Sequence, residues 1–573
     1  MGELLDSAGV FAQVYHDVFI GILRYVLPVL AVILLWRCAK PLLSFPKEPE
    51  IWAMLCLPDG TRMPVTHWES VIGRSKRSDL TIPLKTISRN HAVLTRYDDG
   101  SWTVSDAGSK TGVKVNGKKV DICDITQEDV IELGGLKMYL EPMDQAREYK
   151  LSRLRTRASD LPTSMVNLLL LSLLQALFTF GFILTCQPQD QVAILTGFGG
   201  LFVIQWLLLV FYTLIRRTGF ELETIAFFLS TLGMAVLCTV NPQESVKQLL
   251  ALVLGAVLFL AVGWSLRDLE RAKVIRRLAS VVGIGLLVVT LLFGEEIYGA
   301  KNWLFIGPFS IQPSELSKVC FVFAGASTLE RMMNKKNLIF FIVYSALICG
   351  CLALMNDFGT ALIFFVSFLV IAYMRSGSVG TLALAIAALA FAGVLLIRIA
   401  PHALRRFETW GHIWEDPFDA GYQQTQALMG LVSGGLWGLG MGNGWLKNLF
   451  AADTDVIFAL VCEEWGLILG LVMVLAVVVL ALFSLRSAGV GRSSFYTIGA
   501  CTASAVLLMQ AILNVLGTVD VLFLTGVTFP FVSNGGSSMM ATWGLLAFIK
   551  AADTRQNASF AVKLPKKEDI QYE

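Results

Sequence analysis

The ionisable residues that could do chemistry lie beside long apolar stretches, where charged groups are costly and are by default candidates for function. Glu315 and Lys318 stand three positions apart in the run QPSELSK, so on a helix their side chains share a face and can form an ion pair. Asp416 stands in the run WEDPF. Its carboxylate has the chemistry of a general base, although an Asp before Pro is also a common way to start a turn.

The composition shows what kind of elements must position these residues. Of the 573 residues, 55% are hydrophobic and 16% charged, with a mean hydropathy of +0.65, whereas an ordinary soluble domain is about 25% charged. Residues 51–150 hold 28 charged residues in 100 positions, which indicates one polar domain inserted into a membrane protein. The net charge of +2 creates no field that would recruit nucleic acid, and the ten cysteines have no zinc or redox spacing.

Long apolar runs predict the membrane helices. Spanning a bilayer takes about 20 apolar residues per helix. The predicted spans are thirteen, near 17–37, 163–185, 191–214, 220–240, 248–265, 277–293, 317–334, 338–355, 359–374, 380–399, 456–484, 496–516 and 535–550. The first span lacks the basic n-region and the cleavage site of a removable signal peptide, so we expect a retained anchor.

The basic residues predict the orientation of these helices, since Lys and Arg near helix ends stay cytoplasmic. They cluster in alternate connections, for example around Arg153, Arg216 and Arg271, and this places the polar insert and the C-terminal tail in the cytoplasm. The segments left on the external side are 294–316, 400–455 and 517–534. The 56 residues of 400–455 form the longest of them, and loops of that length are usually functional.

The polar insert at 50–143 has the pattern of a small β-sandwich. Short runs such as VTHWESVIG and SWTVSD alternate apolar and polar residues, with Gly, Asp and Asn at the breaks. The runs IGRS (72–75), ISRNHA (87–92) and SDAGSKTGVKVNG (105–117) stand in an order and spacing that resemble the forkhead-associated (FHA) domain, a phosphothreonine reader.

The FHA resemblance implies a phosphopeptide site at the loop tips of the sandwich, where a charge-assisted fork of donors is needed. The residues that it implies are Arg74, Ser88, Arg89, Lys110 and Thr111. Thr111 departs from the family, which usually has Asn there, and Val113 stands where the family has Thr. We expect His91 to brace the loops rather than to bind the ligand.

Five blocks in the C-terminal part carry a second resemblance. They read GAKNWLFIGPFSIQPSELSKV, NDFGTAL, RRFETWGHIWEDPFDAGYQQTQALMGLVSGGLWGLGMGNG, DTDVIFALVCEEWG and TGVTFPFVSNGGSS. Their order and loop positions resemble the SEDS family (shape, elongation, division and sporulation), the RodA and FtsW type of bacterial cell-wall polymerases. The resemblance covers roughly residues 220–550, ten of the thirteen predicted spans.

The expected fold is therefore a polytopic α-helical membrane protein of about thirteen transmembrane helices, ten of them SEDS-like, with a small all-β, FHA-like sandwich. The expected parts are an anchor (1–45), the sandwich (50–143), a basic linker (144–162), two extra helices (163–215), the SEDS-like domain (220–550) and a cytoplasmic tail (551–573). The resemblance assigns no counterpart in the family to the two extra helices.

The SEDS resemblance implies that the chain polymerises lipid II into peptidoglycan glycan strands at the outer face of the bacterial cytoplasmic membrane, releasing undecaprenyl diphosphate. Asp416 aligns with the essential aspartate of the family, which makes it the expected general base. Glu415 and Asp419 are weaker candidates. The FHA-like domain is expected to couple this activity to Ser/Thr phosphorylation.

Substrate binding is expected to involve the charges around Asp416. The implied residues are Arg405, Arg406, Lys301, Glu315 and Lys318. The first three can stabilise the leaving diphosphate or contact lipid headgroups, a task that a divalent cation (Mg²⁺ or Mn²⁺) can also perform. The sequence assigns no cofactor and no metal ligands. The Glu315–Lys318 pair is expected to shape the groove rather than to catalyse.

Several positions depart from the SEDS pattern or carry charge of unassigned role. Asn302 replaces the usual Arg before Trp303, Asp453 replaces a His and Asn534 replaces a Tyr. Glu463 and Glu464 form a polar patch, for which we expect hydrogen bonds between helices.

The expected partners are lipid II and the nascent glycan, a class B penicillin-binding protein and a cytoplasmic phosphothreonine protein, without nucleic acid. A lipid II flippase and a non-catalytic signalling scaffold remain the alternatives. An acid on a long external loop favours the enzyme, because carriers place their polar residues at the middle of the membrane. The sequence does not distinguish a role in division, elongation or sporulation.

Overall fold

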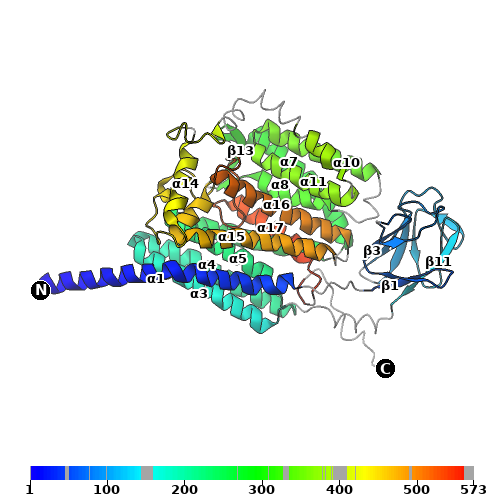
Figure 1. Ribbon diagram of the computed structural model, residues 1–573, viewed down its shortest axis with the longest axis horizontal. Helices are drawn as coiled ribbons and strands as arrows, with labels where there is room; N and C mark the ends of the chain where they lie inside the picture. The colour runs from blue at the N-terminus through cyan, green and yellow to red at the C-terminus, as the bar shows by residue number, and fades with distance from the viewer. Residues whose placement is uncertain are drawn as a thin grey trace.

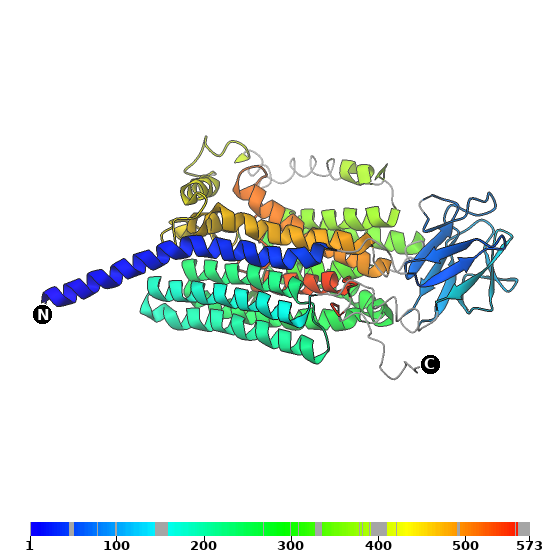
Figure 2. The ribbon, with the colours of Figure 1, turned by 60° about the horizontal axis from the view of Figure 1, so that its bottom comes forward.

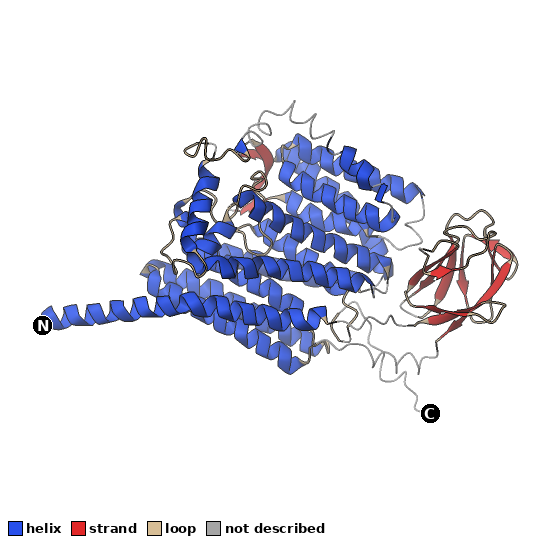
Figure 3. Cartoon of the chain, viewed as in Figure 1, coloured by secondary structure: helices blue, strands red, loops and turns tan. Residues whose placement is uncertain are grey.

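The computed structural model describes residues 2–44, 51–76, 78–97, 100–143, 159–267, 269–297, 299–307, 309–326, 335–376, 379–380, 382–388, 390, 409–419, 421–489, 493–555 and 557–559. They form a bundle of helices with a β domain at one end (Figures 1 and 2). The other end of the bundle, which carries α14 and the strands β12–β14, is called the far end below (Figure 3).

The β domain consists of two sheets, and all of their strand pairs are antiparallel except β3–β4. One sheet has the order β2-β1-β11-β10-β7-β8 and the other β4-β3-β5-β6-β9. The strands are β1 (Ala53–Cys56), β2 (Arg62–Val65), β3 (Glu69–Gly73), β4 (Leu80–Thr81), β5 (Ala92–Arg96), β6 (Trp102–Asp106), β7 (Val113–Val115), β8 (Lys118–Val120), β9 (Ile122–Ile125), β10 (Val130–Leu133) and β11 (Leu136–Pro142). Their inward side chains, such as Leu55, Leu94 and Ile131, form one core between the sheets.

The helical domain contains thirteen helices of more than ten residues within the described residues. They are α1 (Gly2–Leu43), α3 (Leu161–Thr185), α4 (Gln191–Leu214), α5 (Glu221–Val240), α6 (Ser245–Leu266), α7 (Leu269–Phe293), α8 (Pro313–Gly325), α10 (Lys335–Leu354), α11 (Phe358–Ser376), α14 (Tyr422–Gly434), α15 (Ile457–Gly489), α16 (Ser494–Thr518) and α17 (Gly536–Ala551). Short 3-10 turns are η1 (Pro188–Asp190), η2 (Pro242–Glu244) and η3 (Leu446–Asn448), and a small sheet comprises β12 (Glu295–Ile297), β13 (Ala300–Ile306) and β14 (Phe309–Ile311).

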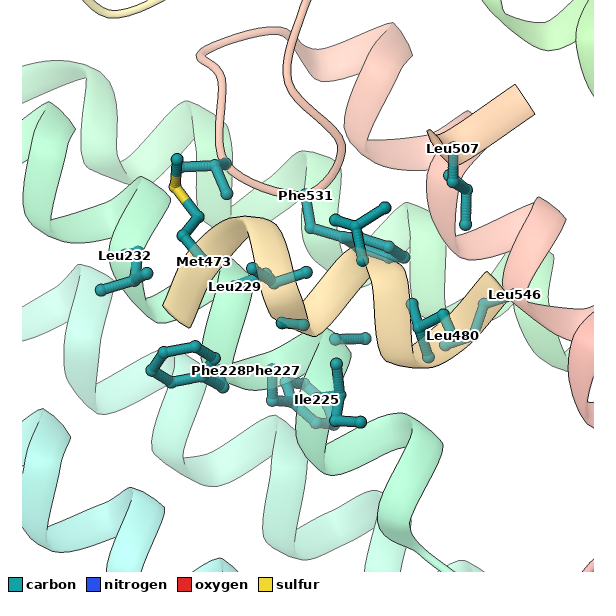
Figure 4. Close-up of a cluster of buried hydrophobic side chains, with 14 of the residues drawn as sticks. Ile225, Phe227, Phe228, Leu229, Leu232, Met473, Leu480, Leu507, Phe531 and Leu546 are labelled. Atoms are coloured by element: carbon teal, nitrogen blue, oxygen red, sulfur yellow. The ribbon is translucent and has the colours of Figure 1, made fainter. Parts of the chain in front are cut away.

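Helix α5 lies at the centre of the bundle. Every residue from Glu221 to Cys238 is buried, as expected of a helix that is apolar on all sides and surrounded by other helices. In Figure 4, Leu229 and Leu232 of α5 lie beside Met473 of α15, and the same buried cluster includes Phe227 and Phe531. By contrast, α4, α6, α7 and α10 expose large apolar side chains on their outer faces, which suits contact with lipid.

The predicted fold class is confirmed, and ten helices in the described part of the chain are long and apolar enough to cross a membrane. The other three predicted spans are not among these ten, although the span predicted at 535–550 coincides with α17. Helix α17 has 16 residues, α8 begins at Pro313, before the predicted span at 317–334, and the span at 380–399 lies mostly outside the described residues. Helix α15 is kinked at Gly466, whose φ is 88°.

The extra helices α3 and α4 are bound to α5 by polar groups inside the bundle. Gln175 and Gln205 exchange two amide hydrogen bonds of 3.0 and 2.9 Å, and Gln175 also donates to Thr231. Buried amides need such partners in an apolar medium. The pair therefore fixes the register of these helices against the domain that resembles SEDS proteins.

A buried ion network lies at the end of the bundle that faces the β domain. Arg555 contacts Glu221 at 3.2 Å and Asp553 at 2.8 Å, and Lys550 contacts Glu223 at 3.0 Å. Burial lowers the pKa of Arg555, but the carboxylates of Asp553 and Glu221 outweigh it and hold the pKa above its usual value. The network ties the start of α5 to the segment that follows α17.

Candidate functional site

Asp416 lies in a turn at the far end of the bundle, directly before α14. Its side chain is exposed. The turn closes where the Gly421 N–H donates to the Asp416 carbonyl at 3.0 Å, and a Cβ on Gly421 would stand 2.3 Å from the Ile413 carbonyl oxygen. Ile413 is buried beneath the turn. Only glycine permits this close approach, so local packing presents the Asp416 carboxylate to solvent.

The segment around Asp416 is anchored to the last turn of α16 and the residues that follow. The three contacts are Trp410 Nε1 to the Val521 carbonyl (3.2 Å), Gly411 N to Asp520 Oδ1 (3.3 Å) and Gln424 Nε2 to the Gly517 carbonyl (3.0 Å). Gln424 is buried, so its bond is protected from water. These contacts fix the position of the turn relative to the bundle.

The residues after α14 are held by two buried carboxylates of α15. The Glu464 oxygens accept from Gly442 N (2.6 Å) and Gly444 N (3.1 Å), and the Glu463 oxygens accept from Trp445 N and Leu446 N (both 3.0 Å). The expectation of hydrogen bonds between helices was therefore wrong for this pair. A backbone turn rich in glycine supplies the donors, which a pattern of side chains does not reveal.

Glu315 and Lys318 form the predicted ion pair in the first turns of α8. Lys318 Nζ lies 2.6 Å from Glu315 Oε1, and the two side chains are 1% and 5% exposed. Within the described part of the chain, the second oxygen of Glu315 has no hydrogen-bond partner. In a buried pair of this kind, the attraction between the two charges compensates for their loss of hydration. A single charge left in its place would have no such compensation.

The remaining predicted substrate residues divide between the described and the undescribed parts of the chain. Lys301 lies on β13, and its Nζ donates to the Leu291 carbonyl at 2.9 Å, a favourable contact for a cation at the end of α7. Asn302 contacts Asp357 at 3.4 Å. Arg405 and Arg406 lie outside the described residues.

Two positions that depart from the SEDS pattern contact each other. Asn534 Nδ2 donates to Asp453 Oδ2 at 2.8 Å, and the Asn534 N–H donates to the Asp453 carbonyl at 2.9 Å. The two replacements therefore form one matched pair that joins the segment before α15 to the segment before α17.

The loop tips of the β domain bring the predicted phosphate-binding residues together. The Arg74 N–H donates to the Ser88 carbonyl (2.9 Å), and the Ser88 hydroxyl accepts from the Lys110 N–H (3.1 Å). The side chains of Arg74, Arg89, Lys110 and Thr111 are exposed. The arrangement offers cationic and hydroxyl donors to one anionic group.

His91 braces these loops, as expected. It is fully buried; its Nδ1 accepts from the Ser88 N–H at 3.1 Å and its Nε2 lies 3.2 Å from the Gly112 carbonyl. Thr111, at the position usual for Asn, lies 3.5 Å from the same ring nitrogen. The ring thus connects the two loops that carry the candidate phosphate donors.

Several functional contacts escaped the sequence reasoning. Glu69 of the β domain, Gln424 of α14 and Arg555 each have a partner far away in the chain. No local motif marks them. A buried charge or amide is visible as such only once the fold is known.

Among the described residues, no group of three or more His, Cys, Asp or Glu side chains could hold a metal ion. The ten cysteines are free thiols, five of them buried.

The fold and the sites define a multi-pass membrane protein with an inserted β-sandwich. Residues 224–558 match the model of the FtsW, RodA and SpoVE family, described as cell cycle proteins, and residues 70–134 match that of the FHA domain. The first match covers more than half of the chain, so the chain belongs to the FtsW/RodA/SpoVE family. The second identifies the β domain as an FHA domain.

Similar proteins agree with this assignment. The probable peptidoglycan glycosyltransferase FtsW of Wigglesworthia glossinidia brevipalpis is 30% identical over 292 residues, 48% of this chain and 75% of the relative. Peptidoglycan glycosyltransferase RodA of Mycobacterium bovis is 28% identical over 433 residues, 68% of this chain and 90% of the relative. These relatives confirm the predicted enzyme class, a peptidoglycan glycosyltransferase.

A solved structure is also similar. One chain of a peptidoglycan synthase complex that coordinates polymerization and crosslinking gives a TM-score of 0.48 at 23% identity, over 58% of this chain and 96% of that chain.

Proposed function

We propose that this protein polymerises lipid II into peptidoglycan glycan strands at the outer face of the bacterial cytoplasmic membrane. The observation that carries the proposal is the exposed carboxylate of Asp416 on a segment held by buried groups at the far end of the bundle. The family resemblance of the sequence aligns this residue with the essential aspartate. The far end is then the external side.

The chemistry proposed for Asp416 is general-base catalysis. A hydroxyl of one lipid-linked glycan attacks the anomeric carbon of the other, the bond from that carbon to the diphosphate breaks, and undecaprenyl diphosphate leaves. Asp416 takes the proton of the attacking hydroxyl. A positioned base of this kind typically contributes about 10²–10⁴-fold to the rate.

The other predicted substrate residues receive distinct roles in this proposal. The buried Glu315–Lys318 pair shapes the groove, because a charge pair with so little exposure is a stable part of the wall. Arg405 and Arg406 are proposed to stabilise the leaving diphosphate. Lys301 is proposed to contribute positive potential at the same surface. Its hydrogen bond to the Leu291 carbonyl holds the ammonium group at the end of α7.

The FHA domain is proposed to lie in the cytoplasm and to bind a phosphothreonine on a partner or on the tail of this chain. Arg74 and Ser88 would donate to the phosphate, with Arg89, Lys110 and Thr111 beside them. The exposure of Arg74, its backbone hydrogen bond to Ser88 and the hydrogen bond from the Lys110 N–H to the Ser88 hydroxyl support this role. A class B penicillin-binding protein is the partner proposed for the external side.

The experiment that tests the proposal uses the purified full chain in liposomes with fluorescent lipid II and a class B penicillin-binding protein. Glycan strands resolved on a gel, with release of undecaprenyl diphosphate, are the expected result. Movement of intact lipid II between leaflets without strands would instead support the flippase. If neither glycan strands nor movement of lipid II is observed, only the scaffold function remains.

A further inference from the structure

The FHA domain touches the helical domain at a specific buried contact. The Ser493 hydroxyl donates to Glu69 Oε1 at 2.6 Å, and both residues are buried, at 3% and 4% exposed. Beside this contact, Lys273 Nζ of α7 lies 5.1 Å from the centre of the Tyr97 ring, a cation–π distance. A carboxylate removed from water needs such a donor, so the contact is a defined docking point.

Ser493 also belongs to the helical domain in its own right. It is the N-cap of α16, and its side chain accepts from the Phe495 N–H. One hydroxyl therefore caps the helix and binds the FHA carboxylate at the same time. Because the N-terminus of a helix favours negative charge, the carboxylate of Glu69 suits this position electrostatically.

The end of α1 and the start of α3, the described helices on either side of the inserted domain, are bound at the same end of the bundle. Arg555 donates to the carbonyl of Pro41, near the end of α1, and Glu221 accepts from the Ser159 N–H, just before α3. Arg555 and Glu221 bind each other. The described chain on either side of the FHA domain is thus bound at this end of the bundle, and the contact of Glu69 with Ser493 attaches the domain itself to α16.

The docking point lies on the strand that leads to the phosphate site. Glu69 begins β3, and Arg74 follows directly after the end of that strand at Gly73. A strand rises about 3.3 Å per residue, so the two side chains stand about 16 Å apart along one continuous segment. The proposed phosphate donor and the docking carboxylate therefore lie at opposite ends of one strand.

The other end of α16 holds the segments at the external site. Asn514 Nδ2 donates to the carbonyls of Thr454, Asp455 and Val527, and the Gly517 carbonyl accepts from Gln424. The helix has 25 residues, most of them buried, and at 1.5 Å per residue it is about 37 Å long. One packed helix thus joins the FHA contact to the anchors of the Asp416 turn.

We propose that the FHA domain is docked on the cytoplasmic end of α16 through Glu69 and Ser493, and that this contact, through α16, sets the order of the external segment 409–424. Regulation of the polymerase site by phosphopeptide binding through this link rests on the proposed function. The physical link itself does not, because it concerns only contacts within the chain.

The test is hydrogen exchange of the full chain in detergent micelles, read by mass spectrometry without any ligand. Glu69→Ala should accelerate exchange in the first turn of α16 by about tenfold, the usual effect of losing a hydrogen bond to a charged group, and exchange in 409–424 by a smaller factor. Glu69→Gln should retain most of the protection, since its amide oxygen still accepts from Ser493. Glu132→Ala, which removes an FHA carboxylate paired with Lys114, is the matched control and should change neither segment.

A second variant is needed in case Glu69→Ala destabilises the FHA domain itself. Ser493→Asp retains a good N-cap for α16 but sets its carboxylate against that of Glu69, so it should undock the domain and accelerate exchange in 409–424. Ser504→Ala, whose hydroxyl binds only within α16 as far as the described contacts show, is its control. Unchanged exchange in 409–424 for both Glu69→Ala and Ser493→Asp would overturn the link, and so would an effect confined to the first turn of α16. Because no substrate or peptide is present, this outcome is independent of whether the chain polymerises lipid II.

Discussion

The proposed phosphate site of the FHA domain and the Asp416 turn are both exposed, but they are positioned in different ways. Ser88 and Lys110, and His91 and Gly112, are bonded across 22 and 21 positions of the sequence. The anchors of the Asp416 turn reach across 93, 109 and 111 positions. The first site is thus built within one small domain, whereas the second depends on the whole helical bundle.

This difference predicts which substitutions will affect each site. A change within the FHA loops should act on phosphopeptide binding and leave the polymerase site intact. A change in a distant helix, by contrast, can displace the Asp416 turn without touching it. The two sites should therefore respond separately to substitutions, except at the docking contact between Glu69 and Ser493.

The largest effect is expected at the buried Glu315–Lys318 pair, which tests how far the far-end site depends on the bundle. Lys318→Ala or Glu315→Ala leaves one buried charge and should cost about 3–5 kcal/mol of stability, with loss of polymerisation. The exchanged pair, Glu315→Lys with Lys318→Glu, keeps the attraction and should retain more activity than either single variant. Thermal unfolding and glycan gels measure both. If the exchanged pair folds but is as inactive as the singles, one of the two residues has a chemical role of its own.

The next effect is expected at the FHA site. Arg74→Ala should weaken binding of a phosphothreonine peptide by about 10–100-fold, because a charge-assisted bond to phosphate contributes about 1.5–3 kcal/mol. Fluorescence anisotropy with the full chain measures it. Arg62→Ala removes the same charge from the other sheet, where Arg62 lies 3.8 Å from Glu141, and should bind as the wild type does. Equal affinity of all three proteins for phosphorylated and unphosphorylated peptides would contradict the phosphate assignment.

A smaller effect is expected at Gln424, the buried long-range anchor of the Asp416 turn. Gln424→Ala removes a hydrogen bond of about 1 kcal/mol and should reduce the polymerisation rate about fivefold without altering phosphopeptide affinity. Gln423→Ala is the control, since the Gln423 amide donates to the Phe450 carbonyl at an exposed position. A normal rate for Gln424→Ala would show that the turn does not need this anchor.

The smallest effect is expected at His91, the local counterpart of Gln424. His91→Ala should lower the affinity for a phosphothreonine peptide several-fold, because the two loops lose their shared brace, and polymerisation in the absence of peptide should remain unchanged. His67→Ala, in the same domain but away from these loops, serves as the comparison. A loss of polymerisation in His91→Ala would show that the two sites are not separate.

Local patterns were enough to predict part of this molecule. The FHA constellation follows from short motifs, and the pairing of Glu315 with Lys318 follows from helical spacing, since both depend on residues close in sequence. Apolar runs located most of the membrane helices for the same reason.

The remaining features could not be predicted from the sequence, because they depend on tertiary contacts. The segment 400–455 was expected to be a loop, yet it contains α14, a helix of 13 residues that is too short and too polar to give a membrane signal. Likewise, the role of Glu463 and Glu464 as acceptors for a glycine-rich turn requires knowing which backbone groups reach them. The matched contact of Asp453 with Asn534 joins positions 81 apart.

The central claim is that Asp416 supplies the base for glycan polymerisation. The most direct measurement compares Asp416→Asn with Asp419→Asn, an equally conservative change at a nearby exposed carboxylate, in the liposome assay with lipid II and a class B penicillin-binding protein. We predict that Asp416→Asn yields no glycan strands at a normal protein level and an unchanged unfolding temperature, whereas Asp419→Asn yields strands of wild-type length. Wild-type strands from Asp416→Asn would contradict the account.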